Sequence, residues 1–291
     1  MNNTLQKQSV LTVKQLSCRQ SSEFQLENIS FSIAKGCCVG IIGPNGSGKT
    51  TLLKAITGFI PADSGEIFYC DHPIESYNQQ ALSKEIAIVL QSTELDQSIF
   101  VEDYILLGRN PYRKRWQFWE SEQDIRIAEE AMKITQIESL RYRKINALSG
   151  GEKQLVRIAR AMAQDPKLFL LDEPTNHLDI AHQLQILSLL NRLKQEKNMS
   201  IMIVLHDLNL ASEFCDVLIL MQHGKIFKMG CAKDVLTFQN IESVYHTLVI
   251  EGENPISKKP YVFLVSEDNL KKSIAQSKNP ETSDIRMETC I

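Results

Sequence analysis

The sequence has 291 residues, 43% of them hydrophobic, and a formal net charge of -3. It can therefore bury one large core or two small ones, and nothing in its charge indicates nucleic acid as the main partner. No run reaches 18 apolar residues, the polar start lacks the pattern of a signal peptide, and the seven cysteines form no CxxC pair; we expect no membrane span, no export and reduced thiols in the cytosol.

The chain begins with elements typical of an antiparallel sheet and continues with a buried strand. Alternating hydrophobicity at residues 11–13 and 29–33 predicts antiparallel strands. The continuous apolar run at residues 37–42 is typical of a strand buried on both faces. A glycine-rich loop follows, and residues 51–56 have the pattern of a helix.

Short apolar strands and helical segments then alternate along the rest of the core. Apolar runs at residues 86–90, 168–171 and 201–205 each end in polar side chains, and residues 181–193 have helical periodicity. This alternation predicts an α/β fold with a mainly parallel sheet and sites at the carboxyl ends of its strands. Residues from about 95 to 165 carry few strand signals, so we expect an inserted helical subdomain there.

The C-terminal residues differ from this core. Residues 247–250 and 261–265 can pair as a hairpin across Asn254 and Pro255, and we expect a β extension over residues 247–266. Residues 267–291 are polar, and we expect a flexible tail. The sequence assigns no function to the hairpin.

The strongest chemical signal is the segment GPNGSGKT, between the buried strand and the helix. It matches G-x-x-x-x-G-K-[ST], a phosphate-binding P-loop, in the context that this loop needs. Its glycines let backbone N–H groups turn toward phosphate oxygens, and the helix N-terminus adds partial positive charge. We expect Lys49 to reach the β- and γ-phosphates and the Thr50 hydroxyl to bind Mg²⁺. The expected ATP-binding residues are Gly43, Pro44, Asn45, Gly46, Ser47, Gly48, Lys49, Thr50 and Thr51.

A second signal is the carboxylate pair Asp172 and Glu173, where an apolar strand ends. Adjacent residues on a strand point to opposite sides, so the two carboxylates can have different roles. Asp172 would hold Mg²⁺, and Glu173 could accept a proton from an attacking water. Such a pair alone is more often a solvated strand end, but the upstream P-loop favours the catalytic interpretation.

A third signal is the segment LSGGEKQ at residues 148–154, which precedes an amphipathic helix. Ser149 with Gly150 and Gly151 at a helix start could be a simple helix cap or a second phosphate cradle. A chain with one P-loop does not need a second cradle for the same nucleotide. The cradle would then close over ATP that another subunit holds.

In the context of the P-loop, this segment resembles the signature motif of ABC-type ATPases. Gln91 is similar to the glutamine of the family's Q-loop, residues 176–179 to its D-loop, and His206 to its switch histidine. The resemblance covers roughly residues 10–246, which we expect to form the ATPase domain. It implies a P-loop NTPase core of RecA-like type with an antiparallel β subdomain and an inserted helical subdomain.

The resemblance also implies how the site is assembled. Two copies would pack head to tail with two ATP molecules between them, and the P-loop of one copy would face the signature segment of the other. The implied residues are Glu173, His206 and Gln91 for catalysis; Thr50, Gln91 and Asp172 for Mg²⁺; and Ser149, Gly150, Gly151 and Asp179 for the nucleotide.

A closer resemblance, to the ATPase subunits of iron-siderophore, haem and vitamin B12 importers, lies in residues 108–111, 176–183 and 206–211. It implies a peripheral subunit on the cytoplasmic face of the cell membrane, two membrane-spanning permease subunits and, indirectly, an extracytoplasmic substrate-binding protein. Two alternatives stay open: an importer of another metal or an oxyanion, and a non-transport ABC ATPase acting on DNA or ribosomes.

Two features depart from this family or stay ambiguous. The family usually places an aromatic residue before the P-loop to stack on adenine, and that place falls near Arg19 or Gln20. The Arg19 guanidinium could stack on the base instead, whereas Phe24 is expected to pack in the sheet. The basic and aromatic residues 113–119 could be a solvated face with core aromatics, or a contact with the membrane subunit or anionic lipid.

Overall fold

The computed structural model describes residues 8–19, 25–91, 98–114, 116–117 and 119–265. Its central sheet has the strand order β10-β9-β3-β8-β7-β6, in which β10 is antiparallel to β9 and the other pairs are parallel. These strands are β3 (Cys38–Ile42), β6 (Ile86–Val89), β7 (Leu168–Asp172), β8 (Ser200–Val204), β9 (Val217–Gln222) and β10 (Lys225–Gly230). Every residue of β3, β7 and β8 is buried, as their continuous apolar runs predict.

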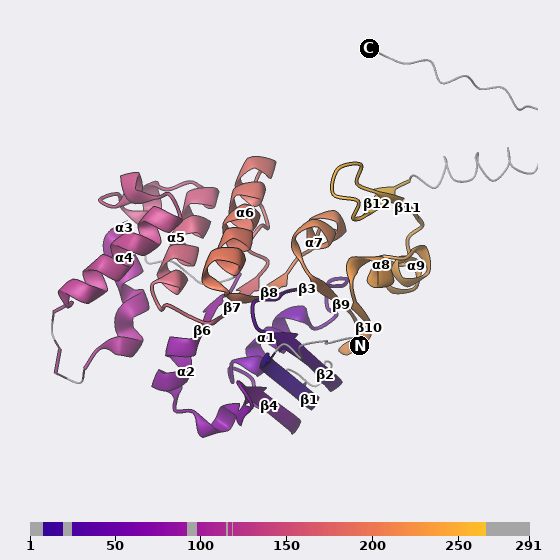
Figure 1. Ribbon diagram of the computed structural model, residues 1–291, viewed down its shortest axis with the longest axis horizontal. Coiled ribbons are helices and arrows are strands. Elements are labelled where there is room, and N and C mark those ends of the chain that lie inside the picture. The colour runs from indigo at the N-terminus through magenta and orange to yellow at the C-terminus, as the bar shows by residue number, and fades with distance from the viewer. Residues whose placement is uncertain (1–7, 20–24, 92–97, 115, 118, 266–291) are drawn as a thin grey trace, which may run out of the picture.

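A smaller sheet of four antiparallel strands lies beside helix α1 (Figure 1). Its order is β2-β1-β4-β5, and the Glu27 N–H donates to the Gly224 carbonyl at 2.9 Å, which joins this sheet to the β9–β10 turn. Its side chains share one apolar cluster with those of α1. The elements are β1 (Ser9–Arg19), β2 (Gln25–Ala34), α1 (Lys49–Ile56), β4 (Ser64–Tyr69), β5 (His72–Pro73), the 3-10 helix η1 (Ile74–Ser76) and α2 (Gln79–Glu85).

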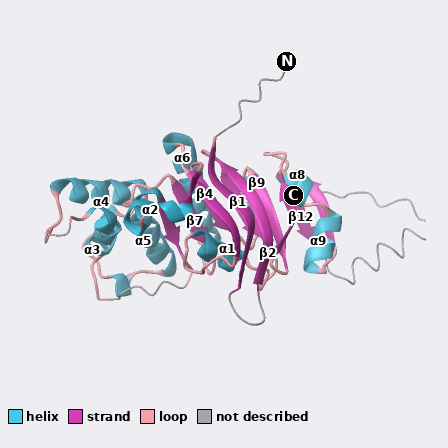
Figure 2. Ribbon diagram, turned by 90° about the horizontal axis from the view of Figure 1, so that it is seen from below, coloured by secondary structure: helices cyan, strands magenta, loops and turns pink. Residues whose placement is uncertain are grey.

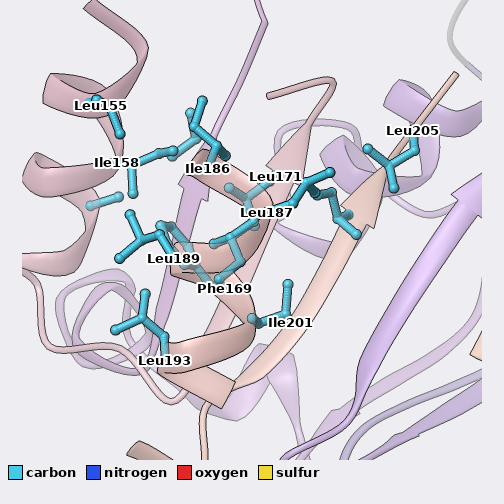
Figure 3. Packing of buried hydrophobic residues seen from close by; sticks show 14 of the residues in the cluster. Leu155, Ile158, Phe169, Leu171, Ile186, Leu187, Leu189, Leu193, Ile201 and Leu205 are labelled. Atoms are coloured by element: carbon cyan, nitrogen blue, oxygen red, sulfur yellow. The ribbon is translucent and has the colours of Figure 1, made fainter. Parts of the chain in front are cut away.

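Helices α5 (Gly150–Met162) and α6 (Ile180–Lys197) pack against the central sheet. Figure 3 shows leucines and isoleucines of both helices around Phe169 and Leu171 of β7, which are fully buried. Fully burying a side chain of this kind contributes about 1.5–3 kcal/mol to stability. This packing fixes the strand that carries Asp172.

The helical subdomain lies at one end of the molecule (Figure 2). Arg109 links separate segments of this subdomain: its Nε donates to Asp124 Oδ1 at 2.9 Å, and its Nη1 donates to the Ala163 carbonyl at 2.7 Å. Besides α5 it contains α3 (Val101–Leu106), η2 (Leu107–Tyr112), α4 (Glu122–Ile134), η3 (Glu138–Leu140) and η4 (Ile145–Ala147).

The tryptophans of the basic and aromatic segment are not core residues. Trp116 is 79% exposed and Trp119 is 84% exposed. Arg115 and Phe118 lie outside the described residues. The expectation of core aromatics is therefore wrong for both tryptophans, because their indole rings lie in solvent.

The C-terminal elements lie at the end of the molecule opposite the helical subdomain (Figure 1). The segments expected to form a hairpin do pair, from Val249 opposite Leu264 to Glu253 opposite Pro260. The elements are α7 (Leu208–Phe214), α8 (Ala232–Val235), α9 (Phe238–Tyr245), β11 (Val249–Glu253) and β12 (Pro260–Leu264). Within the described part of the chain, no helix has the length and apolar character that crossing a membrane requires.

Candidate nucleotide-binding site

Four strands of the central sheet bring distant polar residues to one edge. The P-loop follows β3, and Asp172 ends β7. Because these strands are parallel and β8 lies between them, the Thr50 hydroxyl reaches Asp172 Oδ1 at 3.2 Å across 122 positions of sequence. Gln91, which follows β6, donates from Nε2 to Glu173 Oε2 at 2.8 Å. The expected convergence at the carboxyl ends of strands is thus a feature of the structure.

The P-loop has a shape and a polar lining that fit phosphate. Gly46 and Gly48 have φ angles of 77° and 104°, in the left-handed region that favours glycine. The Ser47 hydroxyl is buried and has no hydrogen-bond partner among the described residues. A buried hydroxyl of this kind is costly unless a ligand satisfies it. The adjacent cavity of about 180 Å³ is lined by Asn45, Gly46, Gly48, Lys49, Thr50, Thr51 and Glu173.

The P-loop is held from behind by the end of β9 and the turn after it. The Gly224 N–H donates to the Ser47 carbonyl at 3.0 Å. A Cβ atom at position 43 would lie 2.4 Å from the Met221 carbonyl oxygen, so only glycine fits there. The backbone of the loop is therefore fixed by the fold itself.

Lys49 is buried inside this loop rather than extended into solvent. Its amine donates to the carbonyls of Gly43 at 2.9 Å and Pro44 at 3.0 Å, and the residue is 5% exposed. Burial lowers the pKa of Lys49, while the carboxylates of Glu173 and Asp172 oppose that shift. The loop carbonyls and the two carboxylates thus favour the charged amine next to the cavity.

Thr50 and Asp172 fit a hard cation such as Mg²⁺. Burial raises the pKa of Asp172, and the nearby Glu173 adds to the shift, whereas the hydrogen bond from Thr50 lowers it. A cation beside Asp172 would favour its charged form. Among the described residues no group of three His, Cys, Asp or Glu side chains could hold a metal. Mg²⁺ commonly takes one or two protein oxygens and completes its shell with phosphates and water, so two oxygens suffice.

Glu173 is the centre of the polar cluster beside the cavity. Its Oε1 lies 2.5 Å from His206 Nε2, and its Oε2 accepts hydrogen bonds from Gln91 at 2.8 Å and from Asn176 Nδ2 at 3.0 Å. Its side chain is 10% exposed. Asn176 was not predicted as a site residue, although its position in the resembling D-loop, three residues after Glu173, was a usable signal.

The two carboxylates diverge for a reason other than the one expected. Asp172 and Glu173 were expected to diverge as neighbours on one strand. Strand β7 ends at Asp172, and Glu173 has a φ of 51°, in the left-handed region. A turn that departs from strand geometry, rather than strand alternation, therefore separates the two side chains.

Other expected residues do not line the P-loop cavity of their own chain. Ser149 caps α5: its N–H donates to Glu152 Oε2 at 2.7 Å, and its Oγ accepts from the Glu152 N–H at 3.3 Å. Asp179 caps α6 in a similar way. Arg19 is an exposed residue at the end of β1, and its stacking on adenine stays a prediction; Gln20 and Phe24 lie outside the described residues.

Comparisons with known proteins agree with this geometry. The sequence model of the ABC transporter family matches residues 26–176. The chain is 35% identical to the iron(3+)-hydroxamate import ATP-binding protein FhuC of Bacillus subtilis, over 86% of this chain and 93% of that protein. It is 36% identical to the uncharacterized ABC transporter ATP-binding protein YvrA of the same organism, over 85% of this chain but only 56% of that longer relative.

The fold is also that of solved ABC cassettes. A metal-chelate type ABC transporter in an inward-facing conformation superimposes with a TM-score of 0.78 and 29% identity. The match covers 90% of this chain and 99% of that one. Together with the P-loop and the polar cluster around Glu173, these similarities show that the chain belongs to the ABC transporter family, as one of its ATP-binding and ATP-hydrolysing subunits.

Proposed function

We propose that this chain energises the import of a metal chelate by hydrolysing ATP as one half of a head-to-tail dimer. The observation that carries the catalytic part is the cluster in which Gln91, Asn176 and His206 surround the Glu173 carboxylate beside the P-loop cavity. In many enzymes a catalytic base is oriented by hydrogen bonds from neighbouring groups. This cluster has that arrangement.

In the proposed reaction the P-loop and Lys49 bind the phosphates, and Glu173 accepts a proton from the attacking water that His206 helps to orient. A general base of this kind contributes about 10²–10⁴-fold to the rate. Thr50, Asp172 and Gln91 would hold Mg²⁺, which neutralises charge on the β- and γ-phosphates. Gln91 also precedes the helical subdomain, so its bond to Glu173 can report the state of the site to that subdomain.

The signature segment completes the site only in a second copy. Ser149, Gly150 and Gly151 stand at the N-terminus of α5 and do not line the cavity of their own chain. We infer that they face the nucleotide held by a partner copy, together with Asp179. Residues 10–246 would form this ATPase domain, residues 247–266 a β extension and residues 267–291 a tail.

The cargo we propose is a metal chelate such as a ferric siderophore, haem or cobalamin. The name of FhuC and the metal-chelate transporter support this choice. The chain would act on the cytoplasmic face of the cell membrane, below two permease subunits and, indirectly, a substrate-binding protein. An importer of another metal or an oxyanion is the alternative.

Growth, uptake and purification experiments test this function. Cells that lack the protein should grow slowly when ferric siderophore, haem or cobalamin is the sole source of its metal, and the chelate concerned should no longer enter membrane vesicles. Unaltered growth on all three, with lost uptake of an oxyanion, would favour the alternative. Purification of the native complex should yield hydrophobic permease chains; ribosomes or DNA in their place would contradict a transport role.

A further inference from the structure

The two glycines of the signature segment differ in what surrounds them. A Cβ atom at Gly151 would lie 2.3 Å from Cδ2, 2.6 Å from Cγ and 2.7 Å from Nε2 of His182. A Cβ atom at Gly150 would meet nothing closer than the Leu178 Cδ2 atom at 3.9 Å. A side chain at Gly151 would therefore overlap the His182 ring in its present position, whereas there is room for one at Gly150.

Asp179 holds the His182 ring beside Gly151. Its Nδ1 lies 2.8 Å and 2.9 Å from the two carboxylate oxygens of Asp179. The backbone N–H of His182 donates to Asp179 Oδ1 at 2.9 Å, so the same carboxylate caps α6 and holds the ring. An aromatic ring bound at one nitrogen and packed on a backbone acts as a rigid spacer.

The ring joins two segments that the proposed site requires in fixed positions. Gly151 lies in the first turn of α5, the helix that begins after Ser149. His182 lies in the first turn of α6, the helix that begins after the D-loop. Glu152 of α5 is also close to His182, which contributes to lowering the pKa of that carboxyl; the first cause is the hydrogen bond from the Ser149 N–H. His182 thus lies close to both Gly151 and Glu152 in the first turn of α5.

We propose that His182 is a positioning residue, which sets the spacing between the signature segment and the D-loop, and that position 151 must be glycine to receive its ring. This rests on the proposed function, because the spacing matters for a nucleotide held by a second copy. An error of about 1 Å in the position of a group can cost on the order of 10²-fold in rate. His182 itself touches no nucleotide in this proposal.

A rescue experiment with the full chain tests the proposal by steady-state ATPase kinetics. Gly151→Ala should lower kcat on the order of 10²-fold, because the methyl group displaces the ring. His182→Ala should lower kcat about tenfold and leave KM for ATP unchanged, because the P-loops that bind the nucleotides are not altered. The double variant Gly151→Ala, His182→Ala should recover to the kcat of His182→Ala, since the added methyl group then has no ring to displace. His182→Gln, which can still donate to Asp179, should lie between His182→Ala and the parent chain.

Gly150→Ala is the matched control: any loss of kcat that it causes arises at the partner's nucleotide and not at the His182 ring, so adding His182→Ala to it should bring no recovery. The proposal is overturned if Gly151→Ala is fully active, if the Gly151→Ala, His182→Ala chain stays as inactive as Gly151→Ala, or if His182→Ala changes KM rather than kcat. If Gly151→Ala fails to fold, the proposal is tested by His182→Ala and His182→Gln alone, through their kcat and KM values. Failure of the proposed function looks different: hydrolysis would then survive Lys49→Ala, whatever residue stands at 182.

Discussion

The side chain of Asn209 makes two hydrogen bonds with the backbone of Val262, donating from Nδ2 to the carbonyl at 3.1 Å and accepting from the N–H at 2.7 Å. The Ser212 hydroxyl donates to the Pro260 carbonyl at 2.7 Å. Asn209 and Ser212 both belong to α7, and the other two residues belong to β12. The C-terminal hairpin is therefore fastened to the helix that begins two residues after His206.

Asn209→Ala removes both bonds at this attachment and should lower the free energy of unfolding by about 1–3 kcal/mol. Urea denaturation measures the loss, and limited proteolysis should show faster cleavage in residues 254–259. Asn191→Ala, in the middle of α6, is the control: it should leave the cleavage rate unchanged and should not lower the free energy of unfolding. Equal cleavage rates in Asn209→Ala and the parent chain would show that the apolar contacts of the hairpin suffice to hold it.

Lys49→Ala should abolish measurable ATP hydrolysis. The variant loses the amine that the P-loop places beside the cavity, and it also loses the bonds to Gly43 and Pro44. Because that amine is buried and hydrogen-bonded, we expect a drop in stability of about 1–3 kcal/mol rather than none. A phosphate-release assay and thermal unfolding check both parts; hydrolysis at the parental rate would remove Lys49 from the site.

Glu173→Gln keeps the shape of the side chain but removes the proton acceptor. Binding of Mg²⁺-ATP should survive because Lys49, Thr50 and Asp172 are unchanged, whereas hydrolysis should fall by at least about 10²-fold. The variant should accumulate as an ATP-bound dimer on size-exclusion chromatography, repeated with the permease present. Normal hydrolysis by Glu173→Gln would mean that another residue is the base.

Substitution of Ser149 tests whether this dimer uses the signature segment. Ser149→Arg in the Glu173→Gln background should prevent closure through bulk, but it also removes the N-cap of α5. Ser149→Asp keeps a good N-cap and should still prevent closure, because its carboxylate repels the γ-phosphate of the partner. ATP-driven dimers in both variants, with and without the permease, would contradict a shared site.

The ion pair between Arg109 and Asp124 should make stability depend on pH. Burial raises the pKa of Asp124, but hydrogen bonds from Ser121 and Arg109 outweigh it, so the pKa lies below its ordinary value. The ionised pair therefore stabilises the fold above about pH 3.9, the unfolded value, and this contribution is lost as pH falls through the lower folded value.

The test for this ion pair is the decrease in the free energy of unfolding that Asp124→Asn causes. Both side chains are nearly buried, so the cost at pH 7 should be about 3–5 kcal/mol, and it should shrink toward pH 3. Glu122→Gln breaks the exposed pair between Arg126 and Glu122 and is the control, expected to change little. A cost of Asp124→Asn that stays constant from pH 7 to pH 3 would show that charge does not hold this contact.

Much of the fold could be predicted because its strands are short apolar runs between recognisable loops. Residues 37–42 and 168–171 closely match β3 and β7, since burial on both faces leaves only apolar side chains. Strands β4 and β10 were not predicted, because exposed and half-buried positions weaken their pattern. Strand β9 was missed although four of its six residues are buried and apolar.

The chemistry was more visible in the sequence than the geometry was. Spacing alone indicated the P-loop and the strand-end carboxylate, but no local rule reveals that Glu173 has a positive φ. The role of His182 depends on the packing of α5 against α6, which residues thirty positions apart do not encode locally. The caps at Ser149 and Asp179 had a signal, a Ser or Asp directly before a helical pattern.

The bond between Gly224 and Ser47 has a consequence for how the nucleotide arrives. The β9–β10 turn holds the P-loop backbone, and Lys49 bonds to two of its carbonyls, all by contacts within the chain. The loop therefore loses its conformational entropy when the chain folds and not when the nucleotide binds. The phosphate groups bind to a loop that already has its final conformation. ATP association should therefore follow a single exponential, whose observed rate constant rises linearly with ATP concentration, without a slow ordering phase.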